Sequence, residues 1–359
     1  MSKNIGLVWL KDDFRLNKNL ALLEATKNHD LVVAFFLYKK KKFENQEAQR
    51  WWISKSLGEF KNKLNTFNIN LEIIDTDNYK SFFEKIFYKK NFSIYWNRTY
   101  EPEYLKFDEF LSNKFKINKI RFNIFKGNIL NEYDEIKKKD GAPFKVFTPF
   151  WRTAEKFYFD KIPKKNKKLS KCVKKISFFK NTINEKEIYP KKKWFKKFEE
   201  YWIPSEDNAL NQLKIFINDK IENYSEARNF PNVIGTSKLS PFIKHGQLHV
   251  ETIWEECIKI KKKGVNKFLA EIGWREFNHS LINHFPHMLK GNYSKKFDKF
   301  PWRKNIKFLS AWKRGLTGYP IVDAGMRELY LTGWMHNRVR MIVGSFLVKH
   351  LLINWLEGE

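Results

Sequence analysis

Short apolar runs alternate with longer amphipathic stretches over the first third of the chain. The runs are rich in Val, Ile, Leu and Phe, and their lengths suit strands buried on both faces of a sheet; they cover residues 5–10, 31–38, 71–74, 93–96 and 120–122. Between the second and third runs, residues 46–67 place Trp, Ile, Leu and Phe at helical spacing. Strand–helix alternation predicts a mostly parallel sheet with helices on both faces, and hence a Rossmann-like α/β domain over residues 1–126.

The pattern changes after this domain. Residues 161–175 are dense in lysine and interrupted by Pro, Asn and Ser, which favours a solvated linker over a direct DNA contact. We therefore place an interdomain linker at 127–193. From 194 to 359 the periodicity predicts an all-α domain, with helices expected at residues 208–221, 265–285 and 335–356.

The net charge is strongly positive. Lys and Arg number 69 and Asp and Glu 40, which gives +29 and a pI near 9.8. Such a charge favours polyanionic partners, chiefly nucleic acid. An AT-rich genome is an alternative source of part of the excess, because Lys, Asn, Ile and Phe are all abundant here and have AT-rich codons. The arginines are therefore more informative than the lysines.

Cysteine and histidine give no sign of a metal site. Cys172 and Cys257 are far apart and form no ligand pattern, and no carboxylate or Cys cluster joins His279, His284 and His287. The apolar run near the N-terminus is short and followed by charge, unlike a signal peptide, and no apolar stretch reaches 18 residues. We therefore expect no metal, no membrane span and a cytoplasmic location.

A cluster of hydroxyls with one cation lies at residues 235–240, where the sequence is Gly-Thr-Ser-Lys-Leu-Ser. At the start of a helix such groups can bind phosphate, although Thr and Ser before a helix are commonly only caps. Tyr224 and Arg228, just upstream, add an aromatic ring and a guanidinium. Both interpretations stay open on the residues alone.

A second group consists of Glu271, Trp274 and Arg275. Positions three and four apart share one face of a helix, so Glu271 lies beside the other two. The group forms either an intrahelical ion pair beside a core tryptophan or a carboxylate and a ring presented to a planar ligand.

A third group lies further along the chain. Trp334, Asn337 and Met341 are spaced by three and four residues, which predicts that they share a helical face, with Arg338 beside them. An amide on an apolar face needs partners, because leaving it unpaired costs roughly 1–3 kcal/mol. A base edge or a backbone carbonyl would serve. Tryptophans in this half of the chain suit core packing, and two of them could instead relay electrons; they are Trp302, Trp312, Trp334 and Trp355.

These residues stand within long ordered matches, and the chain resembles the photolyase/cryptochrome flavoproteins, most closely the class I photolyases of cyclobutane pyrimidine dimers. The resemblance covers nearly the whole chain. It includes Val-Trp-Leu-Lys-Asp-Asp-Phe-Arg-Leu at 8–16 and Arg-Asn-Phe-Pro at 228–231, and it is strongest at 274–277, 317–327 and 332–341. It implies an N-terminal α/β domain for an antenna pigment and a C-terminal helical domain for FAD.

The resemblance also implies roles for individual residues. The cofactor phosphates would be held by Tyr224, Thr236, Ser237, Lys238, Leu239 and Ser240. Damaged DNA would be contacted by Arg228, Trp274, Arg275, Asn337 and Arg338. Glu271 matches the acid that hydrogen-bonds the dimer. Trp302 and Trp355 match the outer and middle tryptophans of the chain that photoreduces the flavin.

Three positions imply the substrate. Relatives that repair (6-4) photoproducts carry His at the positions of Asn337 and Met341 and tend to carry Gln at that of Glu271. The residues here therefore favour a catalyst that splits cyclobutane dimers by electron transfer from reduced FAD to a flipped-out lesion, with dimer-containing DNA as its partner. A signalling cryptochrome is the less favoured interpretation.

The chain departs from the family pattern in two places. Lys290 matches a folate-contacting position, but the neighbouring Asn and Glu of that site are Glu103 and Tyr104 here, so a second antenna chromophore is expected without a known identity. Arg340 matches a cofactor-domain arginine whose carboxylate partner lies in a segment that relatives carry beyond the element at 355–359.

We therefore expect a C-terminally incomplete FAD domain in which a buried Arg340 lacks its partner. The expected protein is a monomer, with a separate C-terminal fragment as one route to activity. A non-enzymatic remnant or a cryptochrome-like light sensor or DNA-binding protein is the alternative.

Overall fold

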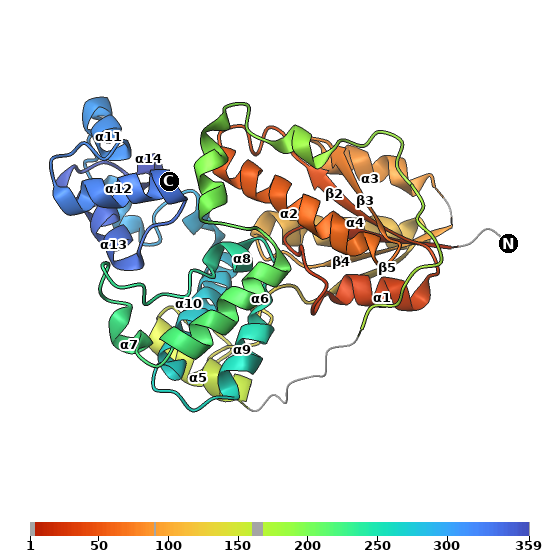
Figure 1. Ribbon diagram of the computed structural model, residues 1–359, viewed down its shortest axis with the longest axis horizontal. Coiled ribbons are helices and arrows are strands. Elements are labelled where there is room, and N and C mark those ends of the chain that lie inside the picture. The colour runs from red at the N-terminus through yellow and green to blue at the C-terminus, as the bar shows by residue number, and fades with distance from the viewer. Residues whose placement is uncertain (1–3, 90, 160–167, 359) are drawn as a thin grey trace.

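The computed structural model describes residues 4–89, 91–159 and 168–358 and contains a sheet flanked by helices beside a helical part (Figure 1). The sheet has five parallel strands in the order β3-β2-β1-β4-β5. They are β1 (Ile5–Leu10), β2 (Val32–Tyr38), β3 (Asn70–Asp75), β4 (Phe92–Asn97) and β5 (Arg121–Phe125). Every predicted strand is confirmed, with ends that shift by a few residues at most.

Both faces of the sheet are apolar and covered by helices, because successive side chains of a strand point to opposite faces. α1 (Leu20–Asn28) and α2 (Glu47–Asn65) pack on one face. α3 (Tyr79–Phe87) and α4 (Pro102–Ile117) pack on the other. The order of the strands reverses between β1 and β4, so the loops after these strands lie where open α/β sheets bind ligands.

The helical part is built around one large apolar core. Its helices are α5 (Phe147–Phe159), α6 (Glu206–Ile215), α7 (Tyr224–Ala227), α8 (Ser240–Lys244), α9 (Val250–Ile258) and α10 (Val265–His284), and a π-helical turn η3 (Phe216–Lys220) follows α6. The helix predicted at 265–285 is confirmed as α10. α5 lies within the predicted linker yet packs tightly on α10, since a Cβ at Gly273 would come within 2.2 Å of the Trp151 ring.

The last helices form a smaller apolar cluster of their own, drawn in blue in Figure 1. They are α11 (Ile306–Lys313), α12 (Pro320–Thr332), α13 (Asn337–Ser345) and α14 (Trp355–Gly358), with a π-helical turn η6 (Phe346–His350). Short 3-10 turns lie earlier in the chain: η1 (Glu185–Ile188), η2 (Lys193–Glu200), η4 (Pro286–Leu289) and η5 (Lys295–Lys299). The prediction of one helix over 335–356 is wrong. The chain leaves the helix after η6, where Leu352 adopts a left-handed φ of 56°. None of the helices in the described residues is both long and apolar enough to cross a bilayer.

The lysine-dense stretch 161–175 lies partly outside the described residues. Over 168–175 its lysines are exposed, as predicted for a solvated segment, but Cys172 is buried. The N–H of Cys172 donates to the carbonyl of Phe67 at 2.9 Å, and the N–H of Val173 donates to that of Asp30 at 3.0 Å. The described part of this stretch is therefore docked on the α/β domain rather than free.

Polar contacts from the loop after β1 join the two parts of the molecule. The buried Arg15 donates from Nη1 to the carbonyl of Gly246 at 2.8 Å. Glu206 accepts the backbone N–H groups of Leu16 and Asn17 at 2.9 and 2.8 Å. These bonds hold the end of β1 against the helical part and so fix the walls of the spaces between them.

Candidate functional site

A cavity of about 440 Å³, here called the larger cavity, lies between the α/β domain and the helical part. Its helical wall contains Glu271 and Arg275 together with four of the six residues for which the resemblance implies cofactor contacts: Tyr224, Ser237, Leu239 and Ser240. These side chains come from α7, from the turn before α8 together with the first residue of α8, and from α10. The fold thus gathers three separate segments around one space, although Thr236 and Lys238 do not line it.

The hydroxyl-rich turn at 235–240 leads into α8, whose N-cap is Leu239 and lacks a side-chain cap bond. The interpretation of these hydroxyls as caps is therefore wrong for α8. Ser237 accepts only a long bond from the N–H of Leu239, at 3.4 Å, and lines the cavity with Ser240. Lys238, with a φ of 53°, instead places its ammonium 4.8 Å from the centre of the Trp334 ring.

α10 presents Glu271 and Arg275 to the larger cavity from successive turns. Glu271 forms an ion pair with Arg228 and lies 3.6 Å from the Lys267 ammonium. Arg275 donates to the buried Glu276 at 2.9 Å. The alternative of an ion pair between Glu271 and Arg275 is not observed, because each of them has another partner.

The α/β domain supplies the opposite wall of the larger cavity, which the sequence did not reveal. The residues of this wall follow β1, β4 and β5: Asp12, Arg98, Thr99, Tyr100, Glu101 and Asn128. The reversal of strand order between β1 and β4 is the signal that would have found most of them, since the loops after these strands meet at one edge. It could be used only once the pairing of the strands was known.

His279 lies on the same wall as Arg275, and burial lowers the pKa of His279 to about 3. Its ring is therefore neutral at physiological pH. The centres of the His279 and Tyr100 rings lie 5.9 Å apart, in an edge-to-face arrangement. No group of three or more His, Cys, Asp or Glu side chains suited to a metal ion occurs within residues 4–89, 91–159 and 168–358.

Aromatic and guanidinium groups lie next to the cavity on the surface. Trp274, 42% exposed, stacks on Phe147 with 3.8 Å between ring centres. Arg228 reaches Glu271, and its guanidinium lies 5.5 Å from the ring centre of Tyr224. The exposed ring of Trp274 and the guanidinium of Arg228 therefore both lie near the larger cavity.

α13 carries four predicted site residues, Asn337, Arg338, Arg340 and Met341, and all of them are exposed. The prediction that Trp334 shares their helical face is wrong, because α13 begins at Asn337 and Trp334 precedes it. The expectation of a buried Arg340 is also wrong. Arg338 donates from Nε and Nη2 to the Asn229 side chain at 3.0 and 2.5 Å.

The two relay candidates are half-buried near the last helices. The ring of Trp302 packs on that of Phe300 at 4.4 Å, and the Trp355 indole donates to the Asn292 side chain at 3.2 Å. Their segments are adjacent, since the N–H of Arg303 donates to the carbonyl of Leu352 at 2.7 Å. The order of these tryptophans in a relay stays a prediction.

Comparison with known proteins identifies the family. Residues 6–168 match the DNA photolyase family, and residues 268–359 match the FAD binding domain of DNA photolyase. A deoxyribodipyrimidine photo-lyase from Agrobacterium fabrum is 36% identical over 98% of this chain, which covers 74% of that protein. This chain belongs to the photolyase/cryptochrome family.

Solved structures of photolyase/cryptochrome proteins agree with the fold. A bacterial class III photolyase from Agrobacterium tumefaciens superposes with a TM-score of 0.92 at 34% identity, covering 100% of this chain and 75% of that one. A Synechocystis cryptochrome superposes with a TM-score of 0.85 at 24% identity, covering 99% of this chain and 77% of that one. The predicted fold and the FAD cofactor are confirmed for the family. Membership of class I is not confirmed and stays a prediction, since one of the similar structures is a class III photolyase.

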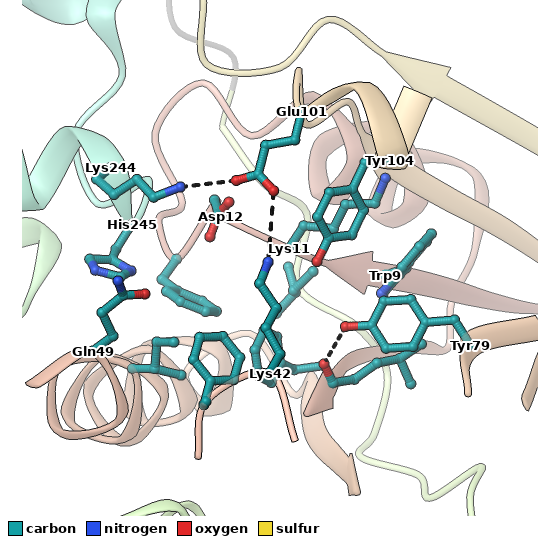
Figure 2. A pocket seen from close by; sticks show the side chains of 16 residues that line it. Trp9, Lys11, Asp12, Lys42, Gln49, Tyr79, Glu101, Tyr104, Lys244 and His245 are labelled. Atoms are coloured by element: carbon teal, nitrogen blue, oxygen red, sulfur yellow. Dashed lines mark hydrogen bonds and ion pairs between the residues drawn. The ribbon is translucent and has the colours of Figure 1, made fainter. Parts of the chain in front are cut away.

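This photolyase-family chain has a second, smaller cavity of about 50 Å³ at the ends of β1 and β2, here called the sheet-edge cavity (Figure 2). Glu101 lies between Lys42 and Lys244, at 3.7 and 3.2 Å, with Asp12 beside it. Asp12, Glu101 and Lys244 also line the larger cavity, so they separate the two spaces. A space of this size holds a few waters. Lys290, exposed after η4, lines neither cavity, so the antenna site stays a prediction.

Proposed function

We propose that this chain holds FAD in the larger cavity and uses light to repair DNA that contains cyclobutane pyrimidine dimers. The observation that carries the proposal is a single cavity that unites Tyr224, Ser237 and Ser240 with Glu271 and Arg275. It combines groups that suit phosphates with a carboxylate that suits a pyrimidine. When bound, FAD supplies the light-driven electron that opens the dimer.

The cofactor phosphates are proposed to lie against the turn before α8. Ser237 and Ser240 offer hydroxyl donors, and Arg275 offers a guanidinium, the group best suited to phosphate. Burial raises the pKa of Tyr224 to about 12, so its hydroxyl keeps its proton and can donate. Support for this assignment comes from the uncapped start of α8, because the serine hydroxyls are not needed there as caps.

The lesion is proposed to enter from the surface that carries Trp274. Base-flipping enzymes, photolyases among them, take the reacting base out of the duplex stack. The exposed indole of Trp274 offers a flat apolar support for the flipped dimer, and Glu271 offers a carboxylate at the cavity wall. Arg228 and Arg338 are placed to bind flanking phosphates, which makes the affinity depend on salt. Asn337 and Met341 would contact the DNA from α13.

The test is illumination of the chain with FAD and thymine-dimer DNA, while lesion-specific binding is measured separately in the dark. Glu271→Gln should lower the repair rate per bound lesion by about ten- to a hundredfold, because it removes a charged hydrogen-bonding group. Glu226→Gln, exposed on α7, is the matched control and should change neither quantity.

The same assay separates the alternatives. Lesion-specific binding without light-dependent repair would favour a light sensor or a DNA-binding remnant over a photolyase. The assay is repeated with the C-terminal segment of a photolyase relative supplied in trans. Repair only in its presence would support the need for a separate fragment. Lesion-independent binding without repair in either condition would contradict the proposed function.

A further inference from the structure

An ordered turn with an apolar tip lies beside the proposed DNA surface. It connects α7 to the segment before α8 and covers residues 229–234, here called the 229–234 turn. Phe230, Val233 and Ile234 are 55, 43 and 73% exposed, although such side chains are usually buried. Apolar groups concentrated at one exposed turn favour a partner that covers them.

The 229–234 turn is held in place by backbone bonds. The N–H of Phe230 donates to the carbonyl of Ala227 at 3.2 Å, and that of Val233 donates to the carbonyl of Phe230 at 3.1 Å. At its base, a Cβ on Gly235 would lie 2.5 Å from the Cβ of Ala227, so only glycine allows the chain to close there. The apolar tip is therefore a pre-formed feature of the molecule.

Two arginines lie at the beginning of the 229–234 turn. Arg228 precedes it and reaches Glu271 on the wall of the larger cavity. The guanidinium of Arg338 in α13 donates two hydrogen bonds to the side chain of Asn229, the first residue of the turn. In the sequence, the turn lies between Tyr224 and Ser237, which both line the larger cavity. An apolar tip that follows two guanidinium groups, near a cavity, has the chemistry of a wedge that enters DNA next to a flipped nucleotide.

We propose that the 229–234 turn inserts Phe230 and Ile234 into the duplex at the gap left by the flipped lesion. Duplex DNA is the favoured occupant because two arginines lie at the beginning of the turn in a chain of net charge +29. The wedge stabilises the opened duplex by covering the bases that face the gap. This inference rests on the proposed binding of a flipped lesion.

The test compares two lesion-bearing DNAs in the dark, with FAD present. One is a duplex with a single thymine dimer and 2-aminopurine in the opposite strand, and the other is the same dimer in a single strand. The single strand has no gap to fill. The double variant Phe230→Ser/Ile234→Ser should lose about tenfold in affinity for the lesion duplex, since it removes two apolar side chains from contact. It should also lose the rise in 2-aminopurine fluorescence and bind the single strand as wild type does.

A matched pair controls for loss of apolar surface elsewhere. Ile306→Ser/Phe308→Ser replaces the same residue types at exposed positions of α11 and should bind the lesion duplex as wild type does. Phe230→Leu/Ile234→Leu should restore binding and the fluorescence rise. Unfolding midpoints of all variants should agree with wild type.

Two results would overturn the wedge. One is unchanged affinity of Phe230→Ser/Ile234→Ser for the lesion duplex, and the other is an equal loss on the duplex and the single strand. Failure of the proposed function would look different. In that case the wild-type chain itself would bind lesion and undamaged duplexes equally at every salt concentration.

Discussion

The two cavities of this molecule share three side chains and differ in almost everything else. The sheet-edge cavity measures about 50 Å³ and is lined by aromatic rings and by ion pairs, whereas the larger cavity measures about 440 Å³. Asp12, Glu101 and Lys244 belong to both. The sheet topology predicts a ligand site at the sheet-edge cavity. Side chains fill most of that space, whereas they leave the larger cavity open.

The charged groups of the two cavities differ in how they are compensated. In the sheet-edge cavity the Lys11 ammonium lies 2.8 Å from Asp108, and both side chains are almost fully buried. Burial lowers the pKa of Lys11, and the charge of Asp108 opposes that shift. In the larger cavity Arg275 pairs with Glu276 but stays partly exposed to the open space. The buried pair of Lys11 and Asp108 has little access to solvent, while the wider cavity leaves room for solvent or a ligand beside Arg275.

Breaking one ion pair in each cavity tests this contrast most strongly. Lys11→Met should destabilise the protein by about 3–5 kcal/mol, because it strands the buried Asp108 without its cation. Arg275→Met should cost only about 1–3 kcal/mol, because Glu276 keeps the backbone donors of Leu130 and Asn131 at 2.8 and 3.4 Å. Urea unfolding curves measure both losses.

The exposed Lys116→Met controls for the change of side chain and should leave stability within about 0.5 kcal/mol of wild type. Equal losses for Lys11→Met and Arg275→Met would show that the larger cavity compensates charge no better than the sheet-edge cavity.

The same contrast explains what the sequence could predict. Strands buried on both faces leave continuous apolar runs, so β1 and its neighbours were found. Glu271 and Arg275 were found because helical spacing places them on one face. The α/β wall of the larger cavity was missed, since Arg98 and Glu101 meet the helical part only through the strand order. The break at Leu352 was missed because a left-handed backbone at a leucine leaves no mark in the apolar pattern.

The two cavities can also be compared through one histidine each, His245 buried and His279 half-buried. Burial lowers the pKa of His245, at the sheet-edge cavity, and of His279, at the larger cavity, to about 3. The unfolded chain takes up these protons near pH 6.5 but the folded protein does not, so stability is complete above that pH and falls as the pH drops toward 3. Between pH 6.5 and 5 each histidine should remove about 2 kcal/mol of stability.

Unfolding curves of His245→Gln and His279→Gln over this pH range measure the two contributions separately. Each variant should show a shallower dependence of stability on pH than wild type. A smaller change for His279→Gln would mean that water in the larger cavity already solvates the imidazolium. An unchanged slope for His245→Gln would contradict the lowered pKa that burial gives His245.

The smallest expected effect concerns Glu101, which belongs to both cavities. Burial opposes the ionisation of Glu101, but Lys244 and Lys42 outweigh it and lower its pKa. All three side chains are at least 40% exposed, so solvent screens these pairs. Glu101→Gln should therefore cost less than about 1 kcal/mol at low salt, with little remaining in 1 M NaCl.

Unfolding midpoints at several salt concentrations check the expectation for Glu101, and Glu24→Gln, which removes an exposed pair within α1, is the control. The carboxylate's contribution is present above its ordinary pKa and is lost as the pH falls through the lowered one, so the cost of Glu101→Gln should vanish in acid. A loss above about 2 kcal/mol that survives high salt would show that Glu101 is a structural wall between the cavities. The two spaces would then be kept apart by this carboxylate rather than by the packing of the aromatic rings around it.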